Sequence, residues 1–205
     1  MTSDAVTSER ATPDIHPLLR DRRSSRIFDP GHVVTETDLV RLLEAARWAP
    51  SAGNSQPWAY LVARRGEPAH DRMVSRLSRG TAAWAPQAGA LVLTLHRAGH
   101  DEDPSMAYSD YAAYDLGQAV AYLTVQAQSL GLHVHQFAGF DHVAMAAEFA
   151  VPPAWSVTTG LAVGRRPALT DDAEAGLLAR DRVPRERKPL ADFVFTDGYG
   201  DPRWP

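Results

Sequence analysis

The sequence predicts one domain of the α+β class, on three observations. The chain has 205 residues, a length that normally forms a single domain with a sizeable core. Short apolar runs predict strands, whereas longer segments with apolar residues three and four positions apart predict helices. Proline and glycine separate these segments throughout, without an internal repeat or a low-complexity block. We expect a disordered leader over residues 1–14, the domain over residues 15–197 and a tail over residues 198–205.

The clearest helices are marked by capping residues and by apolar residues with a period of 3.6. Thr35 and Asp38 form a variant of the capping box at the start of one helix, and Pro50 ends that helix. The longest helix is expected over residues 108–130, where an apolar stripe is followed by Gly131, the residue type typical of the C′ position. Shorter helices are expected over residues 16–22, 71–79 and 141–149.

Strands are expected over five short runs, residues 60–63, 90–95, 133–136, 156–163 and 191–196. The last run, Ala-Asp-Phe-Val-Phe-Thr, alternates like an edge strand but has no hairpin partner close to it in sequence. It is therefore expected either to complete the sheet of its own chain or, as an extended arm, to join the sheet of another subunit.

The composition excludes several classes of function. A formal net charge of −4 argues against nucleic acid as the main partner, because proteins that bind the phosphate backbone usually present a basic surface. The absence of cysteine excludes disulfides, thiolate catalysis and Cys-ligated metal sites. No run approaches the roughly 20 apolar residues that span a bilayer, and the first fourteen residues lack the pattern of a signal peptide. We expect a soluble, cytoplasmic protein without a membrane partner.

A metal site is not expected either. His133 and His135 would share one face of a strand, as two metal ligands might, but no third ligand is evident in the sequence. Trp84 is compatible both with a place in the core and with a loop beside a ligand.

Three segments could bind a ligand. Residues 22–26 (Arg-Arg-Ser-Ser-Arg, the arginine segment) can surround a phosphate with charge-assisted hydrogen bonds, although a charge run is more often a solvated loop. Residues 49–58 (Ala-Pro-Ser-Ala-Gly-Asn-Ser-Gln-Pro-Trp, the Pro-Ser loop) let backbone amides approach a flat ligand, or form an ordinary turn. A C-terminal basic cluster could meet the arginine segment around one phosphate, or lie on a separate exposed loop; it contains Arg182, Arg185, Arg187 and Lys188.

Together these segments resemble the nitroreductase family. Arg-Arg-Ser-x-Arg-x-Phe, followed about two dozen residues later by Ala-Pro-Ser-x-x-Asn-x-Gln-Pro-Trp, resembles the two N-terminal signatures of that family. Asp115-Leu-Gly-Gln resembles its long central helix, Gln136-Phe-Ala-Gly-Phe140 its flavin-facing turn, and residues 157–165 its late strand. The resemblance covers about residues 16–196. It implies a central, mainly antiparallel sheet flanked by helices, with a C-terminal strand extended to the partner subunit of a homodimer.

The resemblance also implies an FMN site in a cleft at the dimer interface. The implied cofactor-binding residues are Arg22, Arg23, Ser24, Arg26, Pro50, Ser51, Ala52, Asn54, Gln136, Ala138, Gly139, Arg185 and Arg187. Arg22 would face the phosphate, and Arg26 would reach the pyrimidine edge of the flavin near N1 and O2. The Pro-Ser loop of the partner subunit would lie against the ring system, and the turn at Gln136 would lie beside N5. The late pair Arg185 and Arg187 would complete the phosphate site.

The implied activity is ping-pong electron transfer from NAD(P)H to a small electron-poor acceptor, such as a nitroaromatic or a quinone. No side chain is expected to act as the catalyst, because the flavin carries the chemistry. A specialised flavin oxidase or dehydrogenase, a reductive dehalogenase and a non-catalytic flavin-binding protein are the alternatives. Two departures from the family pattern bear on the substrate. Ala138 replaces an acidic residue, and Thr81 stands where many relatives have an asparagine.

Overall fold

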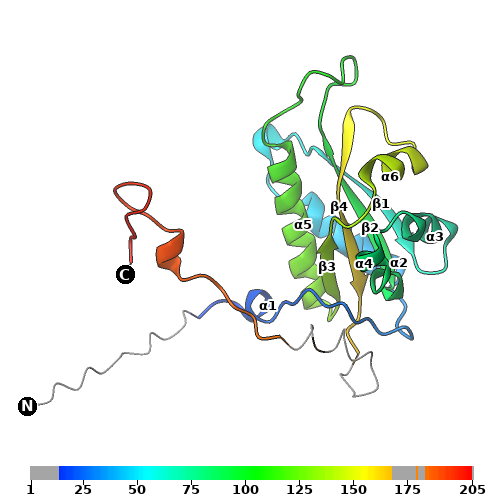
Figure 1. Cartoon of the computed structure of the whole chain (residues 1–205), viewed down its shortest axis with the longest axis horizontal. Coiled ribbons are helices and arrows are strands. Elements are labelled where there is room, and N and C mark those ends of the chain that lie inside the picture. Colours follow the sequence, from blue (N-terminus) through cyan, green and yellow to red (C-terminus); the bar gives the residue numbers. More distant parts are fainter. Residues whose placement is uncertain (1–13, 168–178, 180–182, 205) are drawn as a thin grey trace, which may run out of the picture. The chain divides into compact units, whose positions relative to one another are not determined.

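This computed structural model divides into two units, Met1–Ala168 and Leu169–Pro205. The first unit is built around one antiparallel sheet (Figure 1). The structure describes residues 14–167, 179 and 183–204. Within them the sheet has four strands, in the spatial order β1-β2-β4-β3. The strands are β1 (Trp58–Arg64), β2 (Ala90–Arg97), β3 (His133–Phe137) and β4 (Trp155–Gly164). Four of the five expected strands are confirmed, and the protein has the α+β fold that its sequence predicted.

The central strands β2 and β4 contain long apolar runs of the sequence because neighbouring elements cover them. β2 pairs with β1 on one side and with β4 on the other, so its backbone hydrogen bonds are made within the sheet. Its side chains alternate between two faces. Val92 joins the main core, whereas Leu95 faces the chain that follows α6 (His142–Glu148). Because both faces are covered, residues Ala90 to Leu95 are all buried.

Two long helices cover the face to which Val92 points. α2 (Glu36–Arg47) begins at the expected capping box, in which Thr35 Oγ1 accepts from the Asp38 amide and Asp38 Oδ2 accepts from the Thr35 amide. α5 (Ala112–Ser129) is the long central helix and packs against α2. Their apolar stripes form one core with the sheet, which includes Leu39, Leu42, Ala46, Leu116, Ala119, Val120 and Leu123.

Helix boundaries differ from expectation in two places. α5 begins at Ala112 rather than at residue 108, because the Tyr108 amide donates to the Ala98 carbonyl and holds residue 108 in a loop. The helix expected over residues 71–79 is α3 (Pro68–Ser75), which begins earlier because proline favours the first helical position. The remaining helical elements of the first unit are α1 (Pro17–Arg20), α4 (Arg79–Ala82), η1 (Ala52–Asn54) and η2 (Ala85–Gln87).

The described part of the second unit contains η3 (Leu190–Asp192) and a reversed chain instead of the strand expected over residues 191–196. The Val194 amide donates to the Leu190 carbonyl, and the Arg203 amide donates to the Val194 carbonyl. Gly200, at φ 93°, helps the chain to reverse. Residues 191–196 therefore do not complete the sheet of their own chain, because a local pairing partner, Pro202 for Phe195, lies only a few residues further along the chain. Their extension to another subunit stays a prediction.

Two other expectations concern segments at the margins of the described residues. The expected leader, residues 1–14, lies outside them except for Asp14, as does Arg182 of the C-terminal basic cluster. Among the described helices, none combines the length and the hydropathy that crossing a membrane requires.

Candidate functional site

The arginine segment lies along the end of the sheet at which β4 finishes. The Asp29 amide donates to the carbonyl of Arg165, the residue directly after β4, over 2.8 Å. Ile27 and Phe28 are buried, whereas Arg22, Arg23 and Arg26 are only half-buried. The segment is therefore a fixed part of the fold that presents its guanidinium groups at the surface, and not a loose solvated loop.

Ser25 anchors the backbone of this segment. It is 0% exposed, and its hydroxyl donates to the Ile27 carbonyl over 2.9 Å and accepts from the Ile27 amide over 3.2 Å. Its own carbonyl lies 3.0 Å from Nδ1 of His135 in β3. Beside it, Arg22 Nη1 donates to Ser24 Oγ over 3.2 Å.

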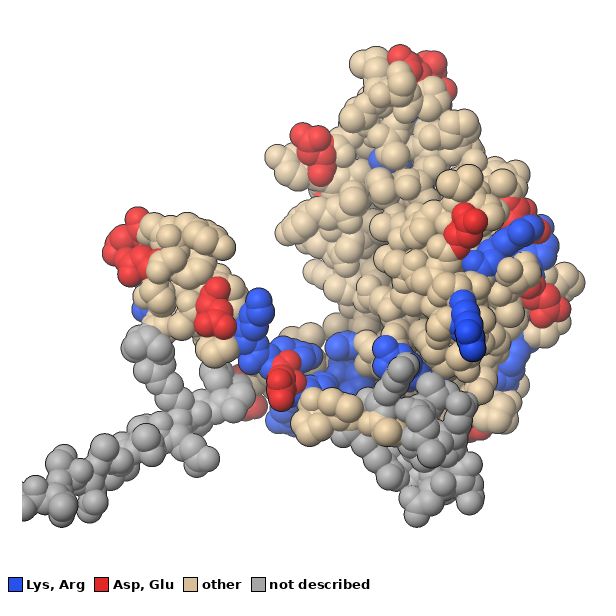
Figure 2. Space-filling view, viewed as in Figure 1, with Lys and Arg blue, Asp and Glu red and all other residues tan. Residues whose placement is uncertain are grey.

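Basic side chains gather at this end of the first unit. Figure 2 shows Lys and Arg side chains where Figure 1 places α1 and the segment after it, and further ones beside α3. The arginine segment contains three of them, and the Arg165 carbonyl bonds to Asp29, three residues after the segment. This local concentration of positive charge contrasts with the net charge of −4 of the whole chain, and it suits an anionic ligand.

The Pro-Ser loop connects α2 to β1 in a strained conformation. Gly53, Asn54 and Gln56 have φ values of 58°, 55° and 48°, in the left-handed region that side chains other than glycine rarely adopt. Ser51 Oγ accepts from the Gln56 amide over 3.0 Å, which helps to hold this shape. Strained loops of this kind are often found at ligand-binding sites.

Asp115 ties the Pro-Ser loop to the first turn of α5. The Ala52 amide donates to Asp115 Oδ2 over 3.0 Å, and the carboxylate is 3% exposed. From the sequence, Asp115 is evident only as part of the helix motif, and its bond to the Pro-Ser loop is not predicted. A signal was present, because Asp115 is a charged residue on the buried face of α5, between Ala112 and Leu116.

A shallow pocket of about 260 Å³ opens where the Pro-Ser loop meets α5. The loop contributes Pro50, Ser51 and Ala52 to its lining. The start of α5 contributes Tyr111, Tyr114, Asp115 and Gln118. Tyr111 and Tyr114 are exposed. Three of the predicted cofactor-binding residues therefore line a common surface, and Asn54 lies beside them on the loop.

The arginine segment and the Pro-Ser loop lie at opposite ends of the sheet. Arg165 marks one end of β4, whereas the amide of Arg97, at the far end of the neighbouring strand β2, donates to the Pro57 carbonyl. Eight residues of extended strand separate these ends by about 25 Å. Figure 1 shows the same separation between α1 and the start of α5. A single chain does not bring Arg26 close to Asn54.

The expected flavin-facing turn, residues 136–140, begins in the last two residues of β3, next to His135, which contacts the arginine segment. Gln136 directly follows His135, and both Gln136 and Ala138 are exposed. The Gly139 carbonyl accepts from the Ser78 amide over 2.8 Å, and a Cβ atom on Gly139 would overlap the Thr81 hydroxyl. Thr81 therefore lies against Gly139, the residue that directly follows Ala138.

The remaining predicted residues belong to the second unit. Arg185 and Arg187 are exposed, and Arg187 Nη1 donates to the Glu186 carbonyl over 2.7 Å. Their proposed meeting with the arginine segment stays a prediction.

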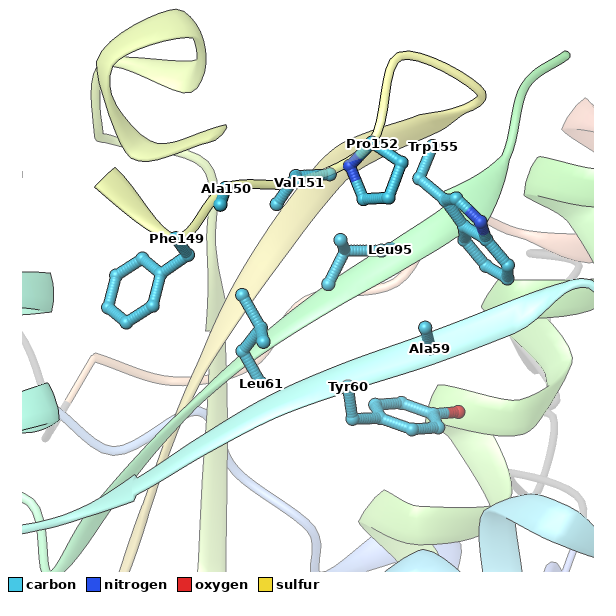
Figure 3. Close-up of a pocket in the computed structure, with 9 residues that line it drawn as sticks. All are labelled: Ala59, Tyr60, Leu61, Leu95, Phe149, Ala150, Val151, Pro152 and Trp155. Carbon is cyan, nitrogen blue, oxygen red and sulfur yellow. The ribbon is translucent and has the colours of Figure 1, made fainter. Parts of the chain in front are cut away.

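A second pocket, of about 170 Å³, lies on the other face of the sheet. In Figure 3 the side chains of Leu61 and Leu95 point toward the chain from Ala150 to Pro152, while Tyr60 points to the opposite side of the sheet. Apart from Trp155, the side chains that point to this face are apolar, and none of the predicted cofactor-binding residues lines the pocket.

The chain is similar to known proteins along most of its length. The family model described as "Nitroreductase family" matches residues 19–165. An uncharacterised 15.4 kDa protein of Mycolicibacterium smegmatis is 36% identical over 153 residues, which are 70% of this chain and 98% of that protein. The major NAD(P)H-flavin oxidoreductase of Aliivibrio fischeri is 44% identical over 50 residues, 23% of either chain. The crystal structure of an oxidoreductase containing FMN is 30% identical, with a TM-score of 0.82 over 98% of this chain and 100% of that one.

Proposed function

This chain belongs to the nitroreductase family, and on that premise we propose that it is an FMN-dependent oxidoreductase. It would take electrons from NAD(P)H and pass them to a small electron-poor acceptor, such as a nitroaromatic or a quinone, in a ping-pong reaction. Support comes from the FMN-containing oxidoreductase that resembles the whole chain and from the NAD(P)H-flavin oxidoreductase that resembles a part of it.

The observation that carries the proposal is the anchored arginine segment. Its donors are guanidinium groups, which recognise phosphate oxygens through paired hydrogen bonds. The backbone that carries them is held by Ser25 and by the Asp29 amide, so these donors are oriented before a ligand arrives. Preorganised donors of this type suit the phosphate and the polar pyrimidine edge of FMN.

Each group of residues has a distinct task in this proposal. Bound FMN supplies the redox chemistry, since it accepts and gives up the electrons. Arg22, Arg23 and Ser24 hold the phosphate side, with Arg185 and Arg187 completing it. Arg26 places a fixed positive charge at the pyrimidine edge and favours the bound state that carries more negative charge there. No side chain acts as a nucleophile.

We also propose that the site needs two copies of the chain. The Pro-Ser loop and the arginine segment of one chain lie too far apart to share one flavin, so the loop of a second copy would cover the ring system. α5 offers a surface for such a copy. Tyr114 and Tyr122 are 67% and 47% exposed, and the exposed Gly117 between them leaves room for close approach. Residues 191–196 would extend to that copy, and a cytoplasmic location would suit the reaction.

The organisation of the chain is part of the same proposal. Residues 15–197 would act as one flavin-binding domain, preceded by a leader over residues 1–14 and followed by a tail over residues 198–205. Limited proteolysis of the FMN-loaded dimer checks this. Early cleavage inside residues 15–197, with release of flavin, would contradict it.

The decisive experiment is an absorbance spectrum of the purified full-length protein, followed by anaerobic titration with NADH and with NADPH. The proposal expects flavin bands that bleach with at least one nucleotide and return when a quinone or nitroaromatic is added. A flavin that stays oxidised would favour an oxidase, dehydrogenase or dehalogenase of the same fold. Bleaching without turnover of any acceptor would favour a binding protein. A colourless protein that ignores added FMN would refute the proposal.

A further inference from the structure

His135 is a buried polar residue that the roles assigned above do not use. It lies in β3 and is 8% exposed. Its Nδ1 atom is 3.0 Å from the carbonyl oxygen of Ser25, 110 residues away in sequence. A carbonyl oxygen can only accept a hydrogen bond, so Nδ1 carries the hydrogen and donates it. The imidazole is therefore a side-chain donor aimed at the backbone of the arginine segment.

Aromatic packing fixes the orientation of this imidazole. The ring of Trp84 lies 4.2 Å from it, centroid to centroid, at an interplanar angle of 38°. Trp84 is itself 5% exposed and also contacts Phe28 at 6.4 Å and Phe137 at 5.9 Å. Since the indole is held by two further rings, the imidazole has little freedom to turn away from Ser25.

Ser25 is in a position to transmit this restraint to the residues that would bind the ligand. It lies directly between Ser24 and Arg26. Its side chain already closes a local turn with Ile27, so the bond from His135 fixes that turn to the sheet. A shift of the Ser25 carbonyl would move the backbone from which Arg26 extends.

We propose that His135 is a positioning residue, which holds the arginine segment in the geometry that binds the phosphorylated flavin. This inference rests on the proposed function for its ligand, but the contact itself is independent of it. The imidazole would not touch the flavin. It would raise flavin affinity because the guanidinium groups are already in place before binding, so less freedom is lost on binding.

Three substitutions separate positioning from simple packing. His135→Phe keeps a ring against Trp84 but removes the donor. His135→Asn loses the ring but places a side-chain N–H close to the position of Nδ1. His142→Phe is the matched control, because His142 Nδ1 also lies 2.9 Å from a backbone carbonyl, that of Val157, and its ring stacks on Phe140 at 4.1 Å. That control site belongs to α6 and makes no hydrogen bond to the arginine segment, and phenylalanine keeps a ring stacked on Phe140 of the flavin-facing turn.

The experiment measures FMN affinity of the full-length apoprotein by quenching of flavin fluorescence, together with the melting temperature and the hydrogen exchange of amides 23–27. Losing one hydrogen bond should weaken FMN binding by about fivefold to tenfold, which corresponds to about 1–1.4 kcal/mol. We expect this loss in His135→Phe, recovery to within about threefold of the wild type in His135→Asn, and wild-type affinity in His142→Phe. Exchange of amides 23–27 should rise only in His135→Phe.

The outcomes separate the inference from the proposed function. If the wild type binds FMN and His135→Phe binds it equally well, the positioning role is wrong while the proposed function stands. Equal losses in His135→Phe and His142→Phe would also refute positioning, because both would then reflect general destabilisation. If the wild type does not bind FMN, the proposed function fails. If hydrogen exchange of amides 23–27 were also unchanged in His135→Phe, the bond from His135 to the Ser25 carbonyl would not anchor the arginine segment, and the inference would fail as well.

Discussion

Replacing Asp115 by alanine should loosen the Pro-Ser loop and destabilise the protein. The buried carboxylate accepts from the Ala52 amide over 3.0 Å, and a hydrogen bond to a charged group is worth about 1.5–3 kcal/mol. Asp115 also lies in the first turn of α5, where an acidic side chain contributes about 0.3–1 kcal/mol. The better helix propensity of alanine returns about 0.5 kcal/mol.

The sum of these contributions predicts a loss of about 2 kcal/mol in the free energy of unfolding. We take a value toward the lower end of that sum, because Ala52 is exposed and water can bond to its amide. For a chain of this size that is a decrease of about 4–8 °C in melting temperature. Asp115→Asn keeps an oxygen that can accept from Ala52, so its loss should be about 1 kcal/mol. The assay is urea denaturation of each variant, with hydrogen exchange of amides 52–56.

Asp141→Ala is a suitable control, since Asp141 Oδ1 caps α6 by accepting from the Ala144 amide. It should cost about 1 kcal/mol and leave exchange in the Pro-Ser loop unchanged. The reasoning would be refuted if Asp115→Ala were no less stable than Asp141→Ala, or if amides 52–56 exchanged at the wild-type rate.

Four further predictions follow from other contacts. Arg26→Ala should weaken FMN retention by about 1.5–3 kcal/mol and slow flavin reduction by NAD(P)H; wild-type values for both would show that Arg26 has no such role. Truncation after Pro184 should loosen the dimer and release flavin, so a tight, yellow truncated dimer in gel filtration would contradict the arm. Gly139→Ala should cost about 1–3 kcal/mol, because its Cβ would overlap the Thr81 hydroxyl; adding Thr81→Ala should recover part of it, and additive losses would exclude the clash. Burial lowers the pKa of His70 from 6.5, so the folded state binds fewer protons and stability should fall as the pH drops through 6.5. His70→Leu should reduce this fall between pH 7.5 and 5.5, and an equal fall in both proteins would count against it.

The sequence predicted the four strands and the longer helices of the first unit because each has a local signal, whereas the short α4, η1 and η2 were not predicted. Thr35 and Asp38 mark the start of α2 by a hydrogen-bond pattern that spans four residues, and burial of both faces of β2 leaves a nearly continuous apolar run. Residues 191–196 do not complete the sheet of their own chain, for the opposite reason. Their alternation fits an edge strand, but Gly200 and Pro202 lie close enough for a local reversal, and that competition is not visible in a short window.

The residue types of the candidate site could be predicted from the sequence, but the hydrogen bonds that hold those residues in place could not. The arginine segment was evident from charge and spacing alone. Two bonds that hold the segment and the residues after it come from His135 and Arg165, more than 100 residues away, and such contacts leave no periodic signal. The same is true of Thr81, whose contact with Gly139 appears only when α4 and the turn after β3 are brought together.

The separation of the two binding segments by the length of the sheet has a thermodynamic consequence. If one flavin needs the arginine segment of one chain and the Pro-Ser loop of another, then loading of the cofactor and association of the chains must strengthen each other by the same free energy. Diluting the protein would release FMN even at constant free flavin, and adding FMN would reassemble separated chains. The amount of active protein in a cell would then rise more steeply than its total concentration.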